Sequence, residues 1–144
     1  MLRHLMGDQS FFEALKDYRA RFAFSNASTK DFQQVCEEHY GAQLDWFFSQ
    51  WIYATGRPFY KVSTDIRPSE VSVTIKQKQS QEIPGRAEKV FIMPIDITIH
   101  YDDGSKETKV IKNDARKQTF TFSVSKRPIS IGFDEGHWVL KKVK

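Results

Sequence analysis

The sequence predicts an α+β fold in which a short helical segment precedes an antiparallel β-sandwich. Two observations lead to this prediction. Apolar residues recur at helical spacing as far as about residue 56, and from residue 58 they alternate with polar residues. About seven short alternating runs with turns between them are typical of a sandwich. We therefore assign residues 1–56 to a helical part and residues 57–144 to a β-sandwich domain.

The composition is that of a globular protein with enough apolar material for a core. Of the 144 residues, 40% are hydrophobic and 28% are charged. No apolar run is long enough to span a membrane, and no secretory signal is recognisable at the N-terminus. These observations do not determine the cellular compartment. If the chain is part of a longer parent protein, that protein is either cytoplasmic or exported. Cys36 is the single cysteine, so no internal disulfide forms.

The net charge of +4 is unevenly spread along the chain. Residues 1–56 carry 5 Lys and Arg against 7 Asp and Glu, whereas residues 57–144 carry 17 against 11. A basic sandwich suits either lysines on solvated strand faces and edges or a surface that binds a polyanion. The lysines alternate with core residues instead of clustering along the sequence, which favours the first interpretation.

The helical part begins with a short apolar stripe that ends at Gly7. A helix of this length is marginal by itself, so we expect Met1 to lie within a longer helix of a truncated parent. Asp8 is predicted to cap a second helix, with one apolar face formed by Phe11, Phe12, Leu15, Tyr18 and Phe22.

Two further helices follow. Ser28 and Asp31 have the spacing of a capping box, and the next stripe comprises Phe32, Val35, Cys36, His39 and Tyr40 before Gly41. A Trp-rich helix then places five apolar residues on one face: Leu44, Phe47, Phe48, Trp51 and Ile52. These few helices cover each other only in part, so a larger apolar body is expected around them.

The strands are predicted from alternation. Val71, Val73 and Ile75 define one strand, and a long strand buries Phe91, Met93, Ile95, Ile97, Ile99 and Tyr101. A turn at residues 102–105 leads into a returning strand at 106–112, with Asp103-Gly104 supplying positive φ angles. Phe120, Phe122 and Val124 mark the next strand, and Ile129, Ile131 and Phe133 another. Residues 137–143 are expected to form the last strand, and residues 77–86 a mobile loop.

The start of the long strand is apolar on both faces, because Val90, Ile92 and Pro94 lie opposite its core face. Either the helical segment or an absent partner covers this patch, or a bulge at Pro94 re-aims the side chains.

The helical part resembles the end of the catalytic domain of the aminopeptidase N-like zinc metallopeptidases, peptidase family M1. The resemblance extends over about residues 1–60. It is carried by Leu5-Met6-Gly7-Asp8, Asn26-Ala27-Ser28-Thr29, Trp46-Phe47-Phe48, Gln50-Trp51, Gly56 and Pro58. The family often continues with a β-sandwich, and residues 131–140 resemble its last strands.

The resemblance implies the C-terminal portion of an enzyme that removes N-terminal residues from peptides by means of zinc. Its chemistry needs an H-E-x-x-H helix, a further Glu ligand, a G-x-M-E-N segment and a Tyr beside the oxyanion, and this sequence contains none of them. His4, His39, His100 and His137 include no pair at the spacing of a zinc helix. We therefore assign no catalytic, cofactor-binding or metal-binding residue, and we expect zinc only in the parent enzyme.

The other groups of candidate residues are explained better by packing and turns than by catalysis or metal binding. Cys36 and His39 share a helix face, but two ligands do not make a zinc site. Trp46 lies off the apolar stripe and faces a ligand, the missing domain or a second packing surface. The acidic pairs Asp102-Asp103 and Asp134-Glu135 are explained by turns, with calcium at the second pair as the alternative.

The leading hypothesis is a non-catalytic fragment of a zinc aminopeptidase, inactive alone, whose sandwich braces the catalytic domain. Its partner is the remainder of that domain, peptides are bound only through the parent, and an exposed apolar face favours self-association. The alternatives are an autonomous β-sandwich module that binds a protein or polyanion, and a Cys36-dependent hydrolase. Nucleic acid is not expected, because Phe120 and Phe122 alternate with Thr and face the core.

Overall fold

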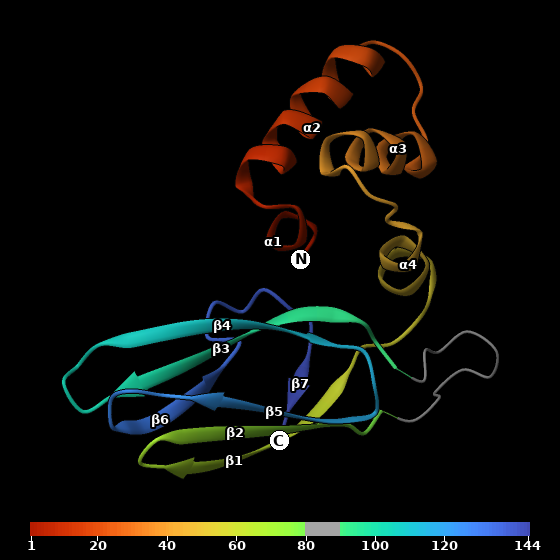
Figure 1. The fold of residues 1–144 in the computed structure, drawn as a ribbon. Helices are drawn as coiled ribbons and strands as arrows, with labels where there is room; N and C mark the ends of the chain where they lie inside the picture. Colours follow the sequence, from red (N-terminus) through yellow and green to blue (C-terminus); the bar gives the residue numbers. More distant parts are fainter. Residues whose placement is uncertain (80–89) are drawn as a thin grey trace. The chain divides into compact units, whose positions relative to one another are not determined.

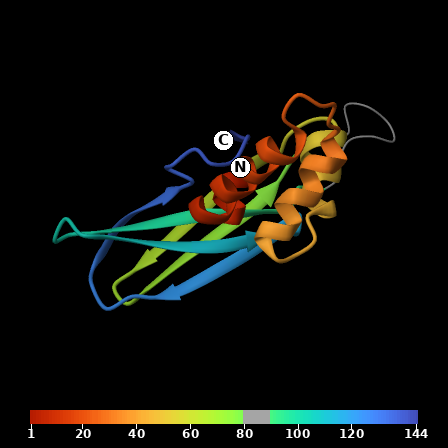
Figure 2. The same ribbon diagram turned by 90° about the horizontal axis from the view of Figure 1, so that it is seen from above.

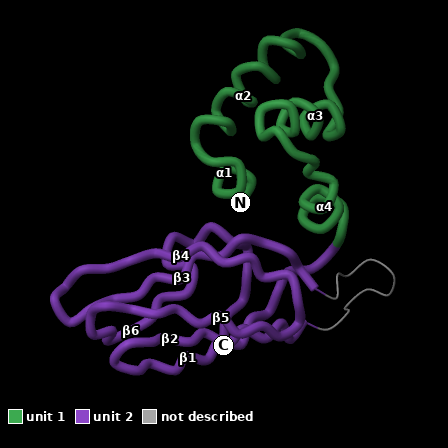
Figure 3. The backbone as a smooth tube through the Cα atoms, viewed as in Figure 1, with its two compact units in different colours: residues 1–54 green, residues 55–144 purple. Residues whose placement is uncertain are grey.

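The computed structural model describes residues 1–79 and 90–144 and comprises two compact units, Met1–Ala54 and Thr55–Lys144 (Figure 3). The first unit is helical and the second consists of strands (Figure 1), which confirms the predicted α+β class. In the described part of the chain, no helix has the length and apolar character needed to cross a membrane.

The helical unit contains two helices of substantial length and several short ones. Its elements are α1 (Leu2–Met6), α2 (Asp8–Phe22), α3 (Thr29–Tyr40), α4 (Asp45–Phe48) and the π-helical segment η1 (Ser49–Tyr53). Helices α2 and α3 lie side by side in both views (Figures 1 and 2).

The predicted capping box at the start of α3 is confirmed. The Asp31 N–H donates to the Ser28 hydroxyl at 3.2 Å, and the Ser28 N–H donates to the Asp31 carboxylate at 2.7 Å. These bonds satisfy donors that a helix N-terminus leaves unpaired. At the other end, Gly41 adopts φ 76°, where a residue without Cβ is favoured, and ends the helix as expected.

Asp8 is not the N-cap of α2, contrary to the prediction. Gly7 occupies that position with φ 79°, and Asp8 is the first helical residue. The Asp8 carboxylate accepts two hydrogen bonds from the Arg3 guanidinium, each of 2.8 Å, and makes no capping bond. A bidentate charged donor therefore replaces the backbone N–H groups as its partner.

Only part of the predicted apolar face of α2 packs inside the unit. Ala14 is fully buried and Tyr18 is half-buried, whereas Phe12 is 52% and Leu15 36% exposed. The other helices thus cover only part of the predicted stripe, as the sequence led us to expect.

The Trp-rich segment is not one continuous α-helix. Leu44, Phe47 and Phe48 are buried as expected, but the winding changes to a π-helix at Ser49. The Ala54 N–H donates to the Ser49 carbonyl five residues earlier, at 2.9 Å. This wider turn displaces later side chains from the apolar stripe, so Ile52 is 52% exposed.

The second unit is a sandwich of two sheets, as predicted. One sheet has the order β5 (Lys117–Ser123), β2 (Glu70–Gln77), β1 (Phe59–Arg67) and β7 (Lys142–Val143). The other has the order β4 (Lys106–Asn113), β3 (Met93–Tyr101) and β6 (Pro128–Phe133). All pairings are antiparallel except the short parallel pairing of β1 with β7.

The core lies between the sheets and follows the predicted alternation. Val71 of β2 belongs to one buried cluster with Ile99 and Tyr101 of β3. The predicted inward face of the long strand, from Phe91 to Tyr101, is at most 5% exposed throughout. The rings of Tyr60 and Phe133, from opposite sheets, pack edge to face with centroids 5.4 Å apart.

The β3–β4 turn differs from the predicted form. Gly104 has φ 80°, but Asp103 does not share a positive φ. The Gly104 N–H donates to the Tyr101 carbonyl, and the Tyr101 N–H donates to the Ser105 carbonyl. This is the pattern of a three-residue hairpin loop in which only the glycine adopts the left-handed conformation.

Three further points about the strands follow from the structure. The last strand covers only Lys142–Val143, because the preceding chain turns around Asp134. The predicted strand with Ile129, Ile131 and Phe133 is β6, in which Ile129 is 58% exposed. No bulge occurs at Pro94, where the β3–β4 register is continuous; the irregularity lies at His100 and Tyr101, on the β6 side.

The predicted loop at 77–86 is only partly within the described residues, since positions 80–89 lie outside them. Its first residue, Gln77, is the end of β2 and is 2% exposed. Its amide bonds to Phe91 and Asn113 explain why a polar side chain is buried there.

Candidate functional site on the helical unit

A row of aromatic rings joins three helices of the first unit. Tyr18 of α2 meets Phe32 of α3 at a centroid distance of 5.1 Å, and Phe32 meets Phe48 of α4 at 6.3 Å. Both contacts are edge to face, the geometry that aromatic pairs favour. The row fixes the helices and thereby the polar groups on their surfaces.

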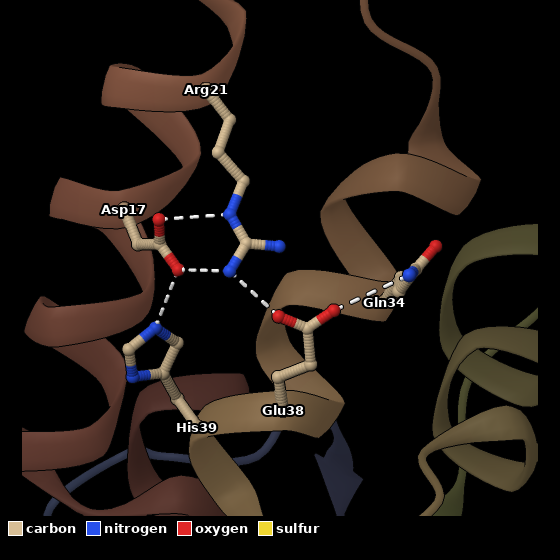
Figure 4. A network of polar contacts seen from close by, with 5 residues as sticks. All are labelled: Asp17, Arg21, Gln34, Glu38 and His39. Atoms are coloured by element: carbon tan, nitrogen blue, oxygen red, sulfur yellow. Dashed lines mark hydrogen bonds and ion pairs between the residues drawn. The ribbon is translucent and has the colours of Figure 1, made fainter.

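An ion-pair network joins α2 to α3 (Figure 4). The Arg21 guanidinium donates to both oxygens of Asp17, at 2.9 and 2.5 Å, and reaches Glu38 at 2.7 Å. His39 Nε2 lies 2.9 Å from the same Asp17 carboxylate. Hydrogen bonds from Arg21, and then from His39, hold the pKa of Asp17 below its ordinary value.

This network suits helix packing better than catalysis. Arg21 also lowers the pKa of Glu38 and is itself held more firmly in the charged form, with its pKa raised. A general base needs a pKa near the operating pH, and both carboxylates are shifted away from it. The network therefore acts as an electrostatic link between the two helices.

Cys36 lies in the core of this unit and is not a nucleophile. Its side chain is fully buried, and burial, with a smaller effect from the Glu37 charge, raises its pKa to about 11. The thiolate is the reactive form of cysteine, and a pKa this high leaves the thiol protonated at neutral pH. This removes the hypothesis of a Cys36-dependent hydrolase.

No candidate zinc site is found among the described residues. Over residues 1–79 and 90–144, no three His, Cys, Asp or Glu side chains are grouped so that they could hold a metal. Cys36 is enclosed in the core, and His39 Nε2 is engaged with Asp17. A structural zinc site needs four ligands and a catalytic one three, so we derive no step through zinc in this chain.

In the two acidic pairs of the sandwich, the carboxylates of Asp103, Asp134 and Glu135 are engaged within the protein. Asp103 accepts from the Ser105 N–H at 2.9 Å and from Lys126 at 2.7 Å, and Lys126 is the main cause of its lowered pKa. Asp134 is fully buried and accepts from the Trp138 and Val139 N–H groups and from the Lys141 ammonium.

These contacts bear on the calcium alternative at Asp134-Glu135. The donors around Asp134 occupy the oxygens that calcium would require, and the Lys141 cation would repel it. Glu135 is engaged separately, with His100 Nε2 at 2.8 Å. The pair therefore organises the chain after β6.

The aromatic residues of β5 face inward. Phe122 packs against the cluster of Val71, Ile99 and Tyr101, and Phe120 is half-buried. They are therefore unavailable as a stacking platform for bases, the feature by which many single-strand binders hold nucleic acid.

The remaining feature of the helical unit is a set of exposed large apolar side chains. Besides Phe12 and Leu15, the set contains Phe24, Ile52 and Tyr53, with exposed fractions of 111%, 52% and 59%. For Trp46 the sequence left three partners open: a ligand, the missing domain or a second packing surface. In the structure it is half-buried with its ring against Phe47. The sequence predicted that the helices need a larger apolar body, but not which side chains would stay outside their own core.

The chain is similar to a peptidase family model and to two proteins named as aminopeptidases. The family model described as the peptidase family M1 domain matches residues 1–51. A leucyl aminopeptidase of Saccharolobus solfataricus is 23% identical over 122 residues, which are 81% of this chain and 15% of that protein. A probable aminopeptidase 1 of Sulfurisphaera tokodaii is 22% identical over 142 residues, 99% of this chain and 17% of that protein.

A solved structure shares the fold. The crystal structure of Legionella pneumophila aminopeptidase A in complex with aspartic acid superposes with a TM-score of 0.77 at 21% identity. The match covers 100% of this chain and 16% of that one. The chain thus spans less than a fifth of the length of the relatives it matches. Residues 1–51 are thus similar to part of the peptidase family M1 domain, and most of the chain is similar to one part of these aminopeptidases.

Proposed function

We propose that this chain is a non-catalytic part of a zinc aminopeptidase. The helical unit completes the catalytic domain, and the β-sandwich braces that domain. Zinc is held by residues outside this chain, and the parent enzyme removes N-terminal residues from peptides. The match of residues 1–51 to the M1 domain and the aminopeptidase relatives support this proposal.

The exposed apolar side chains of the helical unit are the observation that carries the proposal. Phe12, Ile52 and Tyr53 are each more than half exposed. Phe12 lies within the segment that matches an enzyme domain, and Ile52 and Tyr53 follow its last matched residue directly. Burying a large apolar side chain contributes about 1.5–3 kcal/mol. A unit that leaves several of them in water gains stability from a larger apolar partner, which the rest of a catalytic domain supplies.

A chimera tests the proposal. The segment of the Saccharolobus leucyl aminopeptidase that matches this chain is replaced by residues 1–144, and zinc content and hydrolysis of a leucyl substrate are measured. We expect an active, zinc-loaded chimera, and an isolated 144-residue chain without either property. Stoichiometric zinc and peptidase activity in the isolated chain would overturn the proposal.

Matched substitutions test the packing role within the chimera. Phe12→Asp and Tyr53→Asp each place a charge on an exposed apolar position, whereas Ala20→Asp places the same charge on an exposed α2 position with little apolar surface. We expect the first two to lower the activity and melting temperature of the chimera well below those of the Ala20→Asp control. Equal effects for all three would contradict packing through these residues.

A further inference from the structure

The register of one sheet brings three lysines into a row. Lys61 of β1 lies directly opposite Lys76 of β2, and Lys76 lies directly opposite Lys117 of β5. Each residue alternates with an inward-facing neighbour, so all three occupy the outer face of the sheet. The lysines are dispersed along the sequence, but strand pairing gathers them within about 10 Å, at roughly 4.8 Å between strands.

The stability of the sandwich does not account for this row. Like charges directly opposite each other on neighbouring strands are destabilising. Lysines on edge strands discourage edge-to-edge pairing, but β2 lies between β1 and β5 and is not an edge. Within residues 1–79 and 90–144, no ion pair to an acidic side chain is found for any member of the row.

Further cations gather at the same end of the sheet. Lys78 follows β2 directly, is exposed, and donates its N–H to the Phe59 carbonyl at 2.7 Å. Lys142 of β7 is paired with Phe59, and its ammonium lies 5.4 Å from the centroid of that ring. On this face of β1, the acidic residue nearest to Lys61 is Asp65, four positions further along the strand. Its carboxylate forms an ion pair with Arg67.

Hydroxyl groups cover the neighbouring part of the face. The next cross-strand row is Ser63, Thr74 and Thr119, in which the two threonine hydroxyls are 2.8 Å apart. Beyond it, the hydroxyls of Ser72 and Thr121 are 2.9 Å apart. Hydroxyl groups both donate and accept hydrogen bonds, so the face offers a patch of positive charge beside a neutral hydrogen-bonding surface.

We propose that this outer face of the β5-β2-β1-β7 sheet binds a linear sulfated polysaccharide. The lysine ammonium groups pair with sulfates, and the serine and threonine hydroxyls hydrogen-bond to sugar hydroxyls. Nucleic acid fits less well: the aromatic of this face, Phe59, is half-buried beneath Lys142, and a sheet face has no helix or ribbon to enter a groove. The proposal lies beyond the aminopeptidase relationship and is independent of it.

The test measures binding of a defined heparin oligosaccharide to the full 144-residue chain by titration calorimetry at low salt. Lys61→Gln, Lys76→Gln and Lys117→Gln are combined in one variant. The control variant combines Lys16→Gln, Lys106→Gln and Lys112→Gln, which removes the same charge from exposed positions outside this face. Melting temperatures of both variants establish that they fold, and N-desulfated heparin and duplex DNA serve as comparison ligands.

We expect the row variant to lose about tenfold or more in affinity and to depend less steeply on salt, because three cations that neutralise the ligand are gone. The control should lose far less. Lack of heparin binding by the unaltered chain, or equal losses in both variants, would overturn the proposal. DNA binding as tight as heparin binding, and equally sensitive to the row, would overturn the assignment to a sulfated polysaccharide.

Discussion

The fully buried Asp134 carboxylate receives the Lys141 ammonium, and this pair anchors the chain between β6 and β7. The same carboxylate accepts the Trp138 and Val139 N–H groups at 2.9 and 3.0 Å. Removing one partner of a buried pair leaves an uncompensated charge. We therefore expect Asp134→Ala to lower the free energy of unfolding of the sandwich by about 3–5 kcal/mol, measured by urea denaturation.

The matched control for this prediction is Asp65→Ala, which breaks the exposed Asp65–Arg67 pair. Exposed pairs contribute at most about 1 kcal/mol, so its effect should be small. The double variant Asp134→Ala with Lys141→Met removes both charges and should recover part of the loss. Similar losses for Asp134→Ala and Asp65→Ala would show that the buried pair is not the anchor.

The capping box of α3 gives a second prediction. Ser28→Ala removes the hydroxyl that accepts the Asp31 N–H, and the loss of an N-cap costs roughly 1 kcal/mol. Thermal unfolding followed at the helical circular-dichroism band measures this loss. Ser25→Ala, at an exposed position before the cap, should leave the transition almost unchanged, and a comparable effect there would argue against a specific capping role.

Asp17 predicts a pH dependence of the helical unit. Its pKa is lowered in the folded chain by Arg21 and then by His39. A carboxyl group with a depressed folded pKa contributes stability above its unfolded pKa of about 4, and that contribution is lost as the pH falls through the folded value. Thermal melts between pH 7 and pH 2 should therefore show an acid loss that is smaller in Asp17→Asn.

The control for this pH series is Glu13→Gln on the same helix, which should retain the full acid loss. The comparison uses the difference in melting temperature between neutral and acidic buffer for each variant. If Asp17→Asn and the unaltered chain lose the same amount, the network of Figure 4 does not couple protonation of Asp17 to folding.

The buried thiol gives a prediction that separates packing from reactivity. With its pKa raised to about 11 by burial, Cys36 should react very slowly with an alkylating reagent at pH 8 in the native chain. In denaturant it should react at the rate of an ordinary thiol. The modified fraction is read by mass spectrometry over time, and fast native labelling would show that the thiol is accessible.

Features set by local spacing could be predicted from the sequence, whereas features set by distant partners could not. The alternation from Val71 to Ile75 located a core strand, and Ser28 with Asp31 located a helix start. By contrast, the path after Asp134 depends on a buried carboxylate that captures two backbone N–H groups. The pattern of apolar residues in 137–143 does not predict these hydrogen bonds.

The same division holds for the candidate sites. Sequence spacing suggested that the lysines of the sandwich are dispersed, because it carries no information on which strands pair. Only the register of β1, β2 and β5 brings Lys61, Lys76 and Lys117 together. The change from α- to π-helical winding at Ser49 likewise has no clear sequence signal, and it decides that Ile52 lies outside the core.

Gln77 provides the last prediction, since it links the two sheets through a buried amide. Its Nε2 donates to the Phe91 carbonyl at 2.8 Å and to Asn113 Oδ1 at 2.6 Å, and its Oε1 accepts the Phe91 N–H at 2.9 Å. Gln77→Leu keeps the volume roughly constant but removes these three bonds and a fourth, which Gln77 Oε1 accepts from Gln79 Nε2 at 2.9 Å. Because losing a partner for a buried polar group costs about 1–3 kcal/mol, we expect the free energy of unfolding in urea to fall by at least that amount.

The control is Lys112→Leu, which places the same side chain at an exposed position beside Asn113 and should change the free energy of unfolding far less. A Gln77→Leu chain as stable as this control would mean that apolar packing at position 77 replaces the hydrogen bonds without cost.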